Sequence, residues 1–328
     1  MKVEVMDTTL RDGEQTSGVS FTDIEKLNIA KLLLREVKVD RIEVASARVS
    51  KGEMESVKKI TKWASENDLL DKVEVLGFID GKKSIDWIYQ AGGRVVNLLC
   101  KGSLKHVQIQ LKKSLKEHLS DIKEIIDYAK EMNIDVNLYL EDWSNGMKDS
   151  PEYVFSLLND LKNEDINRFM LPDTLGVLDV NETEDYCLQI LEKFPDLNFD
   201  FHAHNDYGLA VANTLAAVKV GMSGIHTTVN GLGERAGNAP LANSIVAIHD
   251  HLKIKTSVDE KMLYEISDIV ERFCGERIAA NTPIVGANVF TQVCGVHADG
   301  DNKGNLYYND LLPERFGRSR KYALGKPS

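Results

Sequence analysis

The chain has few cysteines and no long apolar run. Four cysteines occur in 328 residues, at positions 100, 187, 274 and 294, and no two of them stand at CxxC spacing. This scatter argues against a zinc knuckle or a thioredoxin-like motif and is typical of a reducing compartment. No run approaches the roughly 20 apolar residues that cross a bilayer, and the N-terminal residues lack the apolar core of a signal peptide. We therefore expect a cytoplasmic protein without a membrane partner.

Positive charge is also scarce. Lys and Arg number 40 against 51 Asp and Glu, which leaves a net charge of −11. A nucleic-acid-binding protein normally has a basic face, so binding to a phosphate backbone is disfavoured. An anionic small molecule would need a local group of cations. The segment PERFGRSRK near the C-terminus could supply one, or it could be an ordinary solvated surface.

Short apolar runs alternate with helical stretches along most of the chain. The expected strands cover residues 3–8, 41–46, 72–78, 94–100, 135–141, 168–174, 198–204 and 224–230. The expected helices after them cover residues 22–34, 54–63, 85–90, 115–132, 151–161, 183–191, 209–220 and 242–251. The first helix begins with a capping-box pair, Thr22 and Glu25. Eight strand-helix units within about 250 residues predict a TIM (β/α)8 barrel over residues 1–251.

Two features qualify this fold. A doubly wound sheet is the competing architecture, but it more often has a GxGxxG loop after the first strand, and LRDGEQT stands there instead. Residues 252–328 do not continue the alternation: we expect one helix over 259–273 and then irregular, Gly-rich sequence. This C-terminal subdomain, part helical and part irregular, could cover the barrel mouth or contact a partner chain.

Polar side chains gather where the expected strands end, and TIM barrels carry their active groups at those ends. His202 and His204 stand two residues apart on the seventh strand, so both imidazoles face the same side. Two histidines and a carboxylate are a common facial set for a divalent ion. Asp12 after the first strand is the candidate carboxylate, and Asn238 stands at the matching place after the eighth. These ligands would suit zinc, manganese or magnesium; alternatively, the histidines are merely hydrogen-bonded in a polar mouth.

Three further polar residues stand in the same region. Arg11 could stabilise an oxyanion on a bound carbonyl, or form a structural ion pair with Glu43 on the second strand, or both. Glu141 could act as a general base or anchor an Arg or Lys. Thr174 ends the sixth strand.

Leu76, Leu99 and Tyr139 end the third, fourth and fifth strands. They could be core residues or a small apolar wall that admits a methyl better than a branched group. His297 lies in the Gly-rich segment CGVHADGDNKGN, and it is either a surface residue or a group that a mobile loop carries to the mouth.

Three separated motifs then carry a resemblance. DTTLRDGEQT at residues 7–16, HAHND at 202–206 and NGLGERAGN at 230–238 resemble the signatures of the isopropylmalate, homocitrate and citramalate synthase family. FTQVCGVHADGDNKGNLY at 290–307 resembles the subdomain that follows the barrel in these enzymes. IEVASARVSKGE, NLLCKGS and YLEDWSNG look closest to the bacterial (R)-citramalate synthases.

The resemblance implies an acyltransferase that condenses acetyl-CoA with pyruvate and serves isoleucine biosynthesis. It implies a divalent metal held by Asp12, His202 and His204, with Asn238 near or in its shell. In the implied reaction, Arg11 holds the keto oxygen of pyruvate and Thr174 holds its carboxylate. The methyl group packs against Leu76, Leu99 and Tyr139. Glu141 and His297 form the acid–base pair, and Tyr307 lies near acetyl-CoA. Because His297 would lie outside the barrel, a homodimer with a shared site is expected.

Several alternatives stay open. The chain could act on 2-oxoisovalerate as a 2-isopropylmalate synthase, or be a homocitrate synthase. More distant alternatives are an acyl-CoA carbon–carbon lyase resembling hydroxymethylglutaryl-CoA lyase and a non-catalytic barrel that binds metal or acyl-CoA. Family members usually carry more sequence after this point, including a regulatory domain, so feedback inhibition is not assumed.

Overall fold

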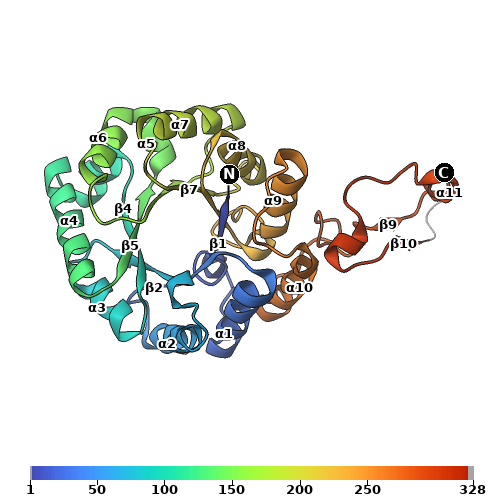
Figure 1. The fold of residues 1–328 in the computed structure, drawn as a ribbon, viewed down its shortest axis with the longest axis horizontal. Coiled ribbons are helices and arrows are strands. Elements are labelled where there is room, and N and C mark those ends of the chain that lie inside the picture. Colours follow the sequence, from blue (N-terminus) through green and yellow to red (C-terminus); the bar gives the residue numbers. More distant parts are fainter. Residues whose placement is uncertain (1, 324–328) are drawn as a thin grey trace.

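The computed structural model describes residues 2–323 and contains a closed barrel of eight parallel strands in chain order (Figure 1). The barrel strands are β1 (Glu4–Asp7), β2 (Arg41–Ser46), β3 (Val73–Phe78), β4 (Val95–Lys101), β5 (Asp135–Glu141), β6 (Arg168–Asp173), β7 (Phe199–Ala203) and β8 (Gly224–Thr227). The barrel closes where β1 pairs with β8, with Val5 opposite Ile225. The predicted TIM barrel is confirmed.

Helices surround this barrel (Figure 1). They are α1 (Asp23–Lys31), α2 (Lys51–Ser65), α3 (Lys83–Gln90), α4 (Leu115–Glu131), α5 (Trp143–Asp149), α6 (Pro151–Leu161), α7 (Val180–Lys193), α8 (Ala210–Val220), α9 (Leu241–Ala247) and α10 (Leu263–Cys274). Short 3-10 segments are η1 (Gly13–Gln15), η3 (Leu70–Lys72), η5 (Val229–Gly231), η7 (Glu260–Met262) and η8 (Pro313–Phe316), and π-helical turns are η2 (Leu32–Val37), η4 (His106–Leu111) and η6 (Ile248–Leu252). The expected capping box of Thr22 and Glu25 is present at α1.

Helix α5 was not expected from the sequence, which predicts the next helix only from residue 151. Asp142 adopts a left-handed conformation (φ 65°) and turns the chain into the helix. Trp143 and Met147, four residues apart, are both buried beneath it. Burial of one helical face therefore outweighs the weak local propensity of Asn and Gly.

The strands bury different residues on their two faces. Outward-facing residues such as Val75, Leu98 and Phe201 belong to the large apolar core between the barrel and its helices. The inward face has a much smaller apolar cluster, made of Met6, Leu76, Tyr139 and Met170, with Phe78 and Leu99 packed against it. The alternation of a strand thus assigns every second side chain to the barrel interior.

The deeper part of the interior is ionic. Arg41 binds Glu74 at 2.8 Å and Asp200 at 2.6 Å, and Arg168 binds Asp200 at 3.0 Å and Glu4 at 2.7 Å. Paired buried charges with several hydrogen bonds each have a fixed geometry, because a broken pair leaves an uncompensated charge. This layer supports the inward residues nearer the mouth.

The C-terminal segment begins as an outer helix and then leaves the barrel. Helix α10 packs against α1, α9 and η2. Beyond it, α11 (Gly295–Gly304) and the two-stranded sheet of β9 (Thr291–Gln292) and β10 (Lys321–Tyr322) project away from the barrel (Figure 1). HADGDNKG therefore forms a helix and not the irregular loop that its glycines suggested.

Two cations of the PERFGRSRK segment, Arg315 and Arg318, are engaged within the chain. Arg315 pairs with Asp250 at 3.0 Å and Glu260 at 2.9 Å. Arg318 donates to the carbonyl oxygens of Ile284 and Gly286 at 3.0 and 2.8 Å. Both side chains thus tie the C-terminal segment together.

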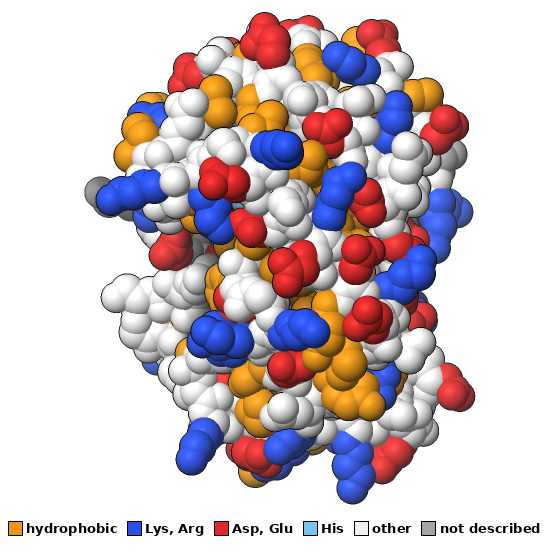
Figure 2. Space-filling model, turned by 90° about the vertical axis from the view of Figure 1, so that its left-hand side faces the viewer, with side chains coloured by type: hydrophobic (Ala, Val, Ile, Leu, Met, Phe, Trp, Pro, Cys, Tyr) orange, Lys and Arg blue, Asp and Glu red, His pale blue; other side chains and the backbone are white. Residues whose placement is uncertain are grey.

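The outer surface mixes both signs of charge. Figure 2 shows Lys and Arg interspersed with Asp and Glu on the face formed around α4. Two ion pairs near this helix are Lys123–Glu164 at 2.7 Å and Lys130–Asp165 at 3.1 Å. Among residues 2–323, no helix combines the length and apolar character needed to span a membrane.

Candidate active site

A cavity of about 200 Å³ opens at the C-terminal ends of the strands. Its lining contains most of the residues that the sequence singled out: Arg11, Asp12, Leu76, Leu99, Tyr139, Glu141, Thr174, His202 and His204. Gln15, Ser46, Phe78, Pro172 and Glu234 complete it. Residues as far apart in the sequence as Arg11 and Glu234 thus share one mouth, because parallel strands of a barrel end on the same side.

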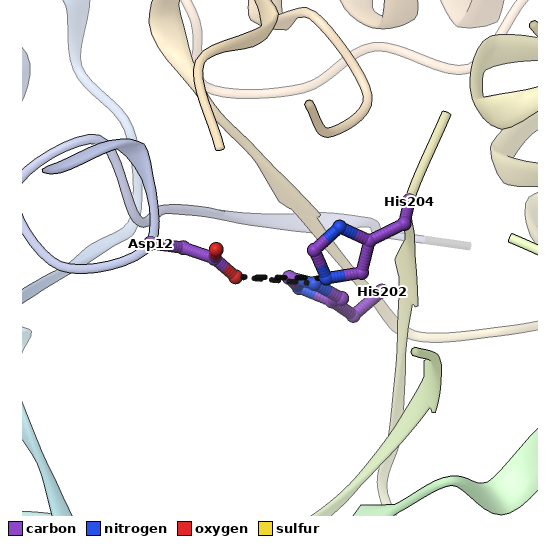
Figure 3. A group of neighbouring side chains, drawn as sticks. All are labelled: Asp12, His202 and His204. Atoms are coloured by element: carbon purple, nitrogen blue, oxygen red, sulfur yellow. Dashed lines mark ion pairs between the residues drawn. The ribbon is translucent and has the colours of Figure 1, made fainter. Parts of the chain in front are cut away.

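Asp12, His202 and His204 point toward one another across the mouth (Figure 3). Asp12 lies in the turn after β1, where its backbone N–H donates to the Thr8 carbonyl at 2.9 Å. Its Oδ2 lies 3.4 Å from Nε2 of His202 and 4.0 Å from Nε2 of His204. One ligand atom from each residue falls within 4.8 Å of the others, which is the spacing of a candidate cation site.

The chemistry of these side chains fits a divalent ion. Burial lowers the pKa of both histidines, and for His202 the neighbouring His204 and His226 add to this effect, so both rings are neutral near pH 7 and could serve as ligands. Asp12 Oδ1 and Asn238 Oδ1 are buried without a hydrogen-bond partner among the described residues. The unpartnered Asp12 oxygen and the two neutral imidazoles form an oxygen and nitrogen donor set, with Asn238 adjacent to His204 through its backbone.

Asn238 reaches this group through the GLGERAGN loop. Its backbone forms an antiparallel bridge with His204, and its Nδ2 donates to the Leu232 carbonyl at 3.0 Å. Gly237 has φ 85°, and a Cβ there would lie 1.9 Å from the Gly231 carbonyl oxygen. Only glycine allows so close an approach, so the loop can fold back and present Asn238.

Arg11 is a cation fixed by several partners. It forms an ion pair with Glu43, lies 3.1 Å from Asp12 Oδ2, and its NH2 group donates to the Tyr139 hydroxyl at 3.4 Å. Burial disfavours the charge, but Glu43 and Asp12 outweigh it and raise the pKa of Arg11 above its ordinary value. The predicted partner Glu43 is confirmed, and Arg11 also faces the cavity.

Glu141 and Thr174 both border the cavity with defined partners. Glu141 forms an ion pair with Lys101, so an anchor for a cation, which the sequence offered as an alternative, is present. Thr174 Oγ1 accepts a hydrogen bond from the Asp142 backbone N–H at 2.9 Å. Its own hydroxyl proton remains able to donate into the cavity.

His297 and Tyr307 are not brought to this mouth within the same chain. Both lie at α11 or just after it, on the segment that projects from the barrel (Figure 1). Their rings contact each other, with centroids 4.1 Å apart, and both side chains are exposed. The structure therefore keeps the two together but away from the other residues.

Sequence reasoning missed several residues of the site. Phe78 lines the cavity two positions after Leu76, and the period of the strand could have revealed it. Lys101 and His226 also occupy strands β4 and β8, and their contacts with Glu141 on β5 and His202 on β7 depend on the register and side-chain direction of neighbouring strands.

The fold and this mouth together define a TIM barrel with a histidine–carboxylate group at its C-terminal face. A family model described as HMGL-like matches residues 2–270, and the chain belongs to that family. The (R)-citramalate synthase of Methanocaldococcus jannaschii is 38% identical over 328 residues, and the chain spans 65% of its length. The 2-isopropylmalate synthase of the same organism is 37% identical over 325 residues, and the chain covers 61% of it. The resemblance that the motifs indicated is confirmed.

A solved structure supports the fold. The HMG-CoA lyase of Bacillus subtilis superposes with a TM-score of 0.72 at 23% identity, over 84% of this chain and 95% of that one. At this level of identity the likeness concerns the architecture of the barrel.

Proposed function

We propose that this chain is an acyltransferase that condenses acetyl-CoA with a 2-oxo acid, with pyruvate as the preferred acceptor and citramalate and CoA as products. The observation that carries this proposal is the shared mouth. Arg11, Glu141 and the group of Asp12, His202 and His204 border one cavity, beside an apolar wall. The chemistry needs a stabilised oxyanion, a base and a place for a small acyl group, and these residues are of the required types.

The proposed metal site consists of Asp12, His202 and His204, with Asn238 beside them. When bound, a divalent ion would act as a Lewis acid on the keto and carboxylate oxygens of the acceptor. Manganese, magnesium and zinc all accept such ligands, so the identity of the metal is to be determined by experiment.

The side chains of the mouth have distinct parts in the proposed reaction. Glu141 removes a proton from the acetyl methyl group, and the methyl carbon forms a bond to C2 of the oxo acid. Arg11 stabilises the negative charge that develops on the keto oxygen, which then takes up a proton. Thr174 donates to the acceptor carboxylate, and water finally cleaves the thioester to release CoA.

The wall of the cavity favours a small acceptor. Leu76 and Tyr139 of the inner apolar cluster, and Leu99 and Phe78 packed against it, line the cavity. A methyl group fits against this wall with fewer clashes than an isopropyl group. The second candidate is a 2-isopropylmalate synthase, because relatives of both names have nearly the same identity to this chain.

We also propose that two copies share their sites. His297 and Tyr307 lie on the projecting segment that contains α11, β9 and β10, which we call the arm, and both side chains are exposed. Exposed polar groups on such an arm are available to contact a second subunit. In a two-fold dimer each arm could reach the mouth of the other barrel. His297 would then work with Glu141 of the second chain, and Tyr307 would lie near acetyl-CoA.

The test is a panel of acceptors. Pyruvate, 2-oxoisovalerate and 2-oxoglutarate are each supplied with acetyl-CoA, and released CoA is followed with a thiol reagent, with and without added divalent metal. We expect metal-dependent CoA release that is fastest with pyruvate. Preference for 2-oxoisovalerate would favour the second candidate, and no release with any acceptor in a protein shown to be folded would overturn the proposal.

A further inference from the structure

A second histidine lies directly beneath His202 inside the barrel. His226 faces inward from β8, and its side chain is fully buried. Its Nδ1 lies 3.3 Å from Nδ1 of His202 and 3.0 Å from the Tyr139 hydroxyl. Its Nε2 lies 3.1 Å from Oδ2 of Asp200. His226 therefore connects the ionic layer of the barrel to the mouth.

The direction of each hydrogen bond follows from Asp200. Arg41 and Arg168 both donate to this buried carboxylate, at 2.6 and 3.0 Å, so it remains an ionised acceptor. His226 must then donate from Nε2, which leaves a lone pair on its Nδ1. The neighbouring Nδ1 of His202, at 3.3 Å, can bond to this lone pair only as an N–H donor, and it shares the lone pair with the Tyr139 hydroxyl at 3.0 Å.

These hydrogen-bond directions determine which ring nitrogen of His202 presents a lone pair to the mouth. With its proton on Nδ1, a neutral His202 has a lone pair on Nε2, the nitrogen 3.4 Å from Asp12. A metal ligand needs that lone pair. The opposite tautomer would place a proton where an ion should bind.

The packing around Asp200 leaves room for this arrangement. Gly224 is the partner of Asp200 in the β7–β8 pairing and faces the same interior. A Cβ at position 224 would lie 2.0 Å from Asp200 Oδ1. Any larger residue at position 224 would displace the Asp200 carboxylate, so Gly224 is needed for the hydrogen bond between Asp200 and His226.

We propose that His226 is a positioning residue. Held by Asp200, it accepts a hydrogen bond from Nδ1 of His202, selects the tautomer of that ring and orients it toward the ion. Its Nδ1 is also within reach of the Tyr139 hydroxyl, so one nitrogen links the ligand group to the wall of the cavity. This inference rests on the metal site of the proposed function.

The first test needs no metal. Selective ¹⁵N labelling of histidine in the metal-free protein, with NMR assignment through single histidine variants, reads the protonated nitrogen of each ring. At a mildly alkaline pH we expect the proton of His226 on Nε2 and that of His202 on Nδ1. A proton on Nε2 of His202 would overturn the inference, whether or not the protein binds metal.

The second test measures metal affinity by calorimetry. His226→Phe keeps the ring but removes both nitrogens, and we expect metal affinity about 10- to 100-fold weaker than that of the wild type. His226→Asn retains an oxygen able to accept from His202, so it should recover part of the loss. His249→Phe, which alters a histidine paired with Glu260 outside the mouth, is the matched control.

The outcomes separate the two proposals. Wild-type affinity in a folded His226→Phe variant would overturn the inference and leave the metal site standing. A wild-type protein that binds no divalent ion would overturn the proposed metal site, while the NMR result still decides the tautomer. If His226→Phe does not fold, the NMR measurement of the His202 and His226 tautomers in the wild-type protein decides whether the inference holds.

Discussion

Lys101 and Glu141 stand opposite each other on β4 and β5, and the ammonium group of Lys101 forms an ion pair with the Glu141 carboxylate. Both side chains are largely buried at the mouth, with 11% and 25% of their surfaces exposed. The proposed base Glu141, which lines the cavity, is thus held by an ion-pair partner on the neighbouring strand.

The first prediction concerns this pair. Glu141→Gln should lower kcat by about 10²- to 10⁴-fold, because the side chain can no longer accept a proton. Lys101→Met should cause a smaller loss, about tenfold, through a poorly oriented carboxylate, and Lys101→Arg should restore part of it. Steady-state kinetics of CoA release measure both. Lys219→Met removes a surface partner of Glu184 and should change nothing; full activity in Glu141→Gln would exclude this residue as the base.

The second prediction concerns the metal. Chelation should abolish activity, and readdition of a divalent ion should restore it. Asp12→Ala and His204→Ala should each weaken binding by about 100-fold or more, since the loss of a direct ligand exceeds that of a supporting partner. Metal content by mass spectrometry and binding calorimetry provide the measurement. His251→Ala, at an exposed histidine outside the mouth, is the control, and undiminished metal content in both ligand variants would contradict the site.

The third prediction concerns the acceptor. Leu99→Ala should raise the ratio of kcat/KM for 2-oxoisovalerate to that for pyruvate by about tenfold, because it removes part of the wall against the larger substrate. Met170→Ala shortens a residue of the same inner cluster that does not line the cavity. That control should leave the ratio close to wild type. An unchanged ratio in Leu99→Ala would mean that this wall does not select the substrate.

The fourth prediction tests the shared site. Neither Glu141→Gln nor His297→Ala should be active by itself. Co-expressed with different tags and purified as a mixture, they should regain roughly a quarter of wild-type activity per chain, since random pairing yields one intact site in each mixed dimer. Activity and the mass of the assembly in solution provide the measurement. Persistent inactivity of a verified mixed dimer would refute the exchange of His297 between subunits.

The fifth prediction concerns acid stability. His118 is buried on α4, where its Nε2 accepts a hydrogen bond from the Lys101 backbone, and burial lowers the pKa of His118 to about 4. The unfolded chain takes up this proton near the ordinary pKa of about 6.5, whereas the folded chain does so only near 4. Between these values the unfolded state binds more protons, so stability should fall as pH decreases, by up to about 3 kcal/mol.

Urea denaturation across this pH range measures the effect. His118→Gln should reduce the slope of the unfolding free energy against pH. The corresponding change at the exposed His251 should not. An identical slope in wild type and His118→Gln would show that acid sensitivity arises elsewhere.

The barrel and much of its mouth were predictable from local patterns. The alternation of strand and helix patterns predicted eight strand–helix units. The two-residue spacing of His202 and His204 predicted that both rings lie on one face of β7. The same logic placed Asp12, Glu141 and Thr174 at strand ends, and all three line the cavity. Helix α5 was not predicted, because burial of Trp143 and Met147 outweighs the low helix propensity of the residues between them.

The sequence by itself determined the class of fold and the edge of the barrel at which the polar groups meet, because strand periodicity and the polarity of a parallel barrel are local properties with a single geometric consequence. Only the tertiary structure decided that Lys101 meets Glu141, that Asp200 and His226 support His202 from below, and that His297 stays outside its own barrel. Those relationships depend on register, side-chain direction and the path of the final segment. Packing across the whole molecule sets these features, and no short stretch of residues encodes them.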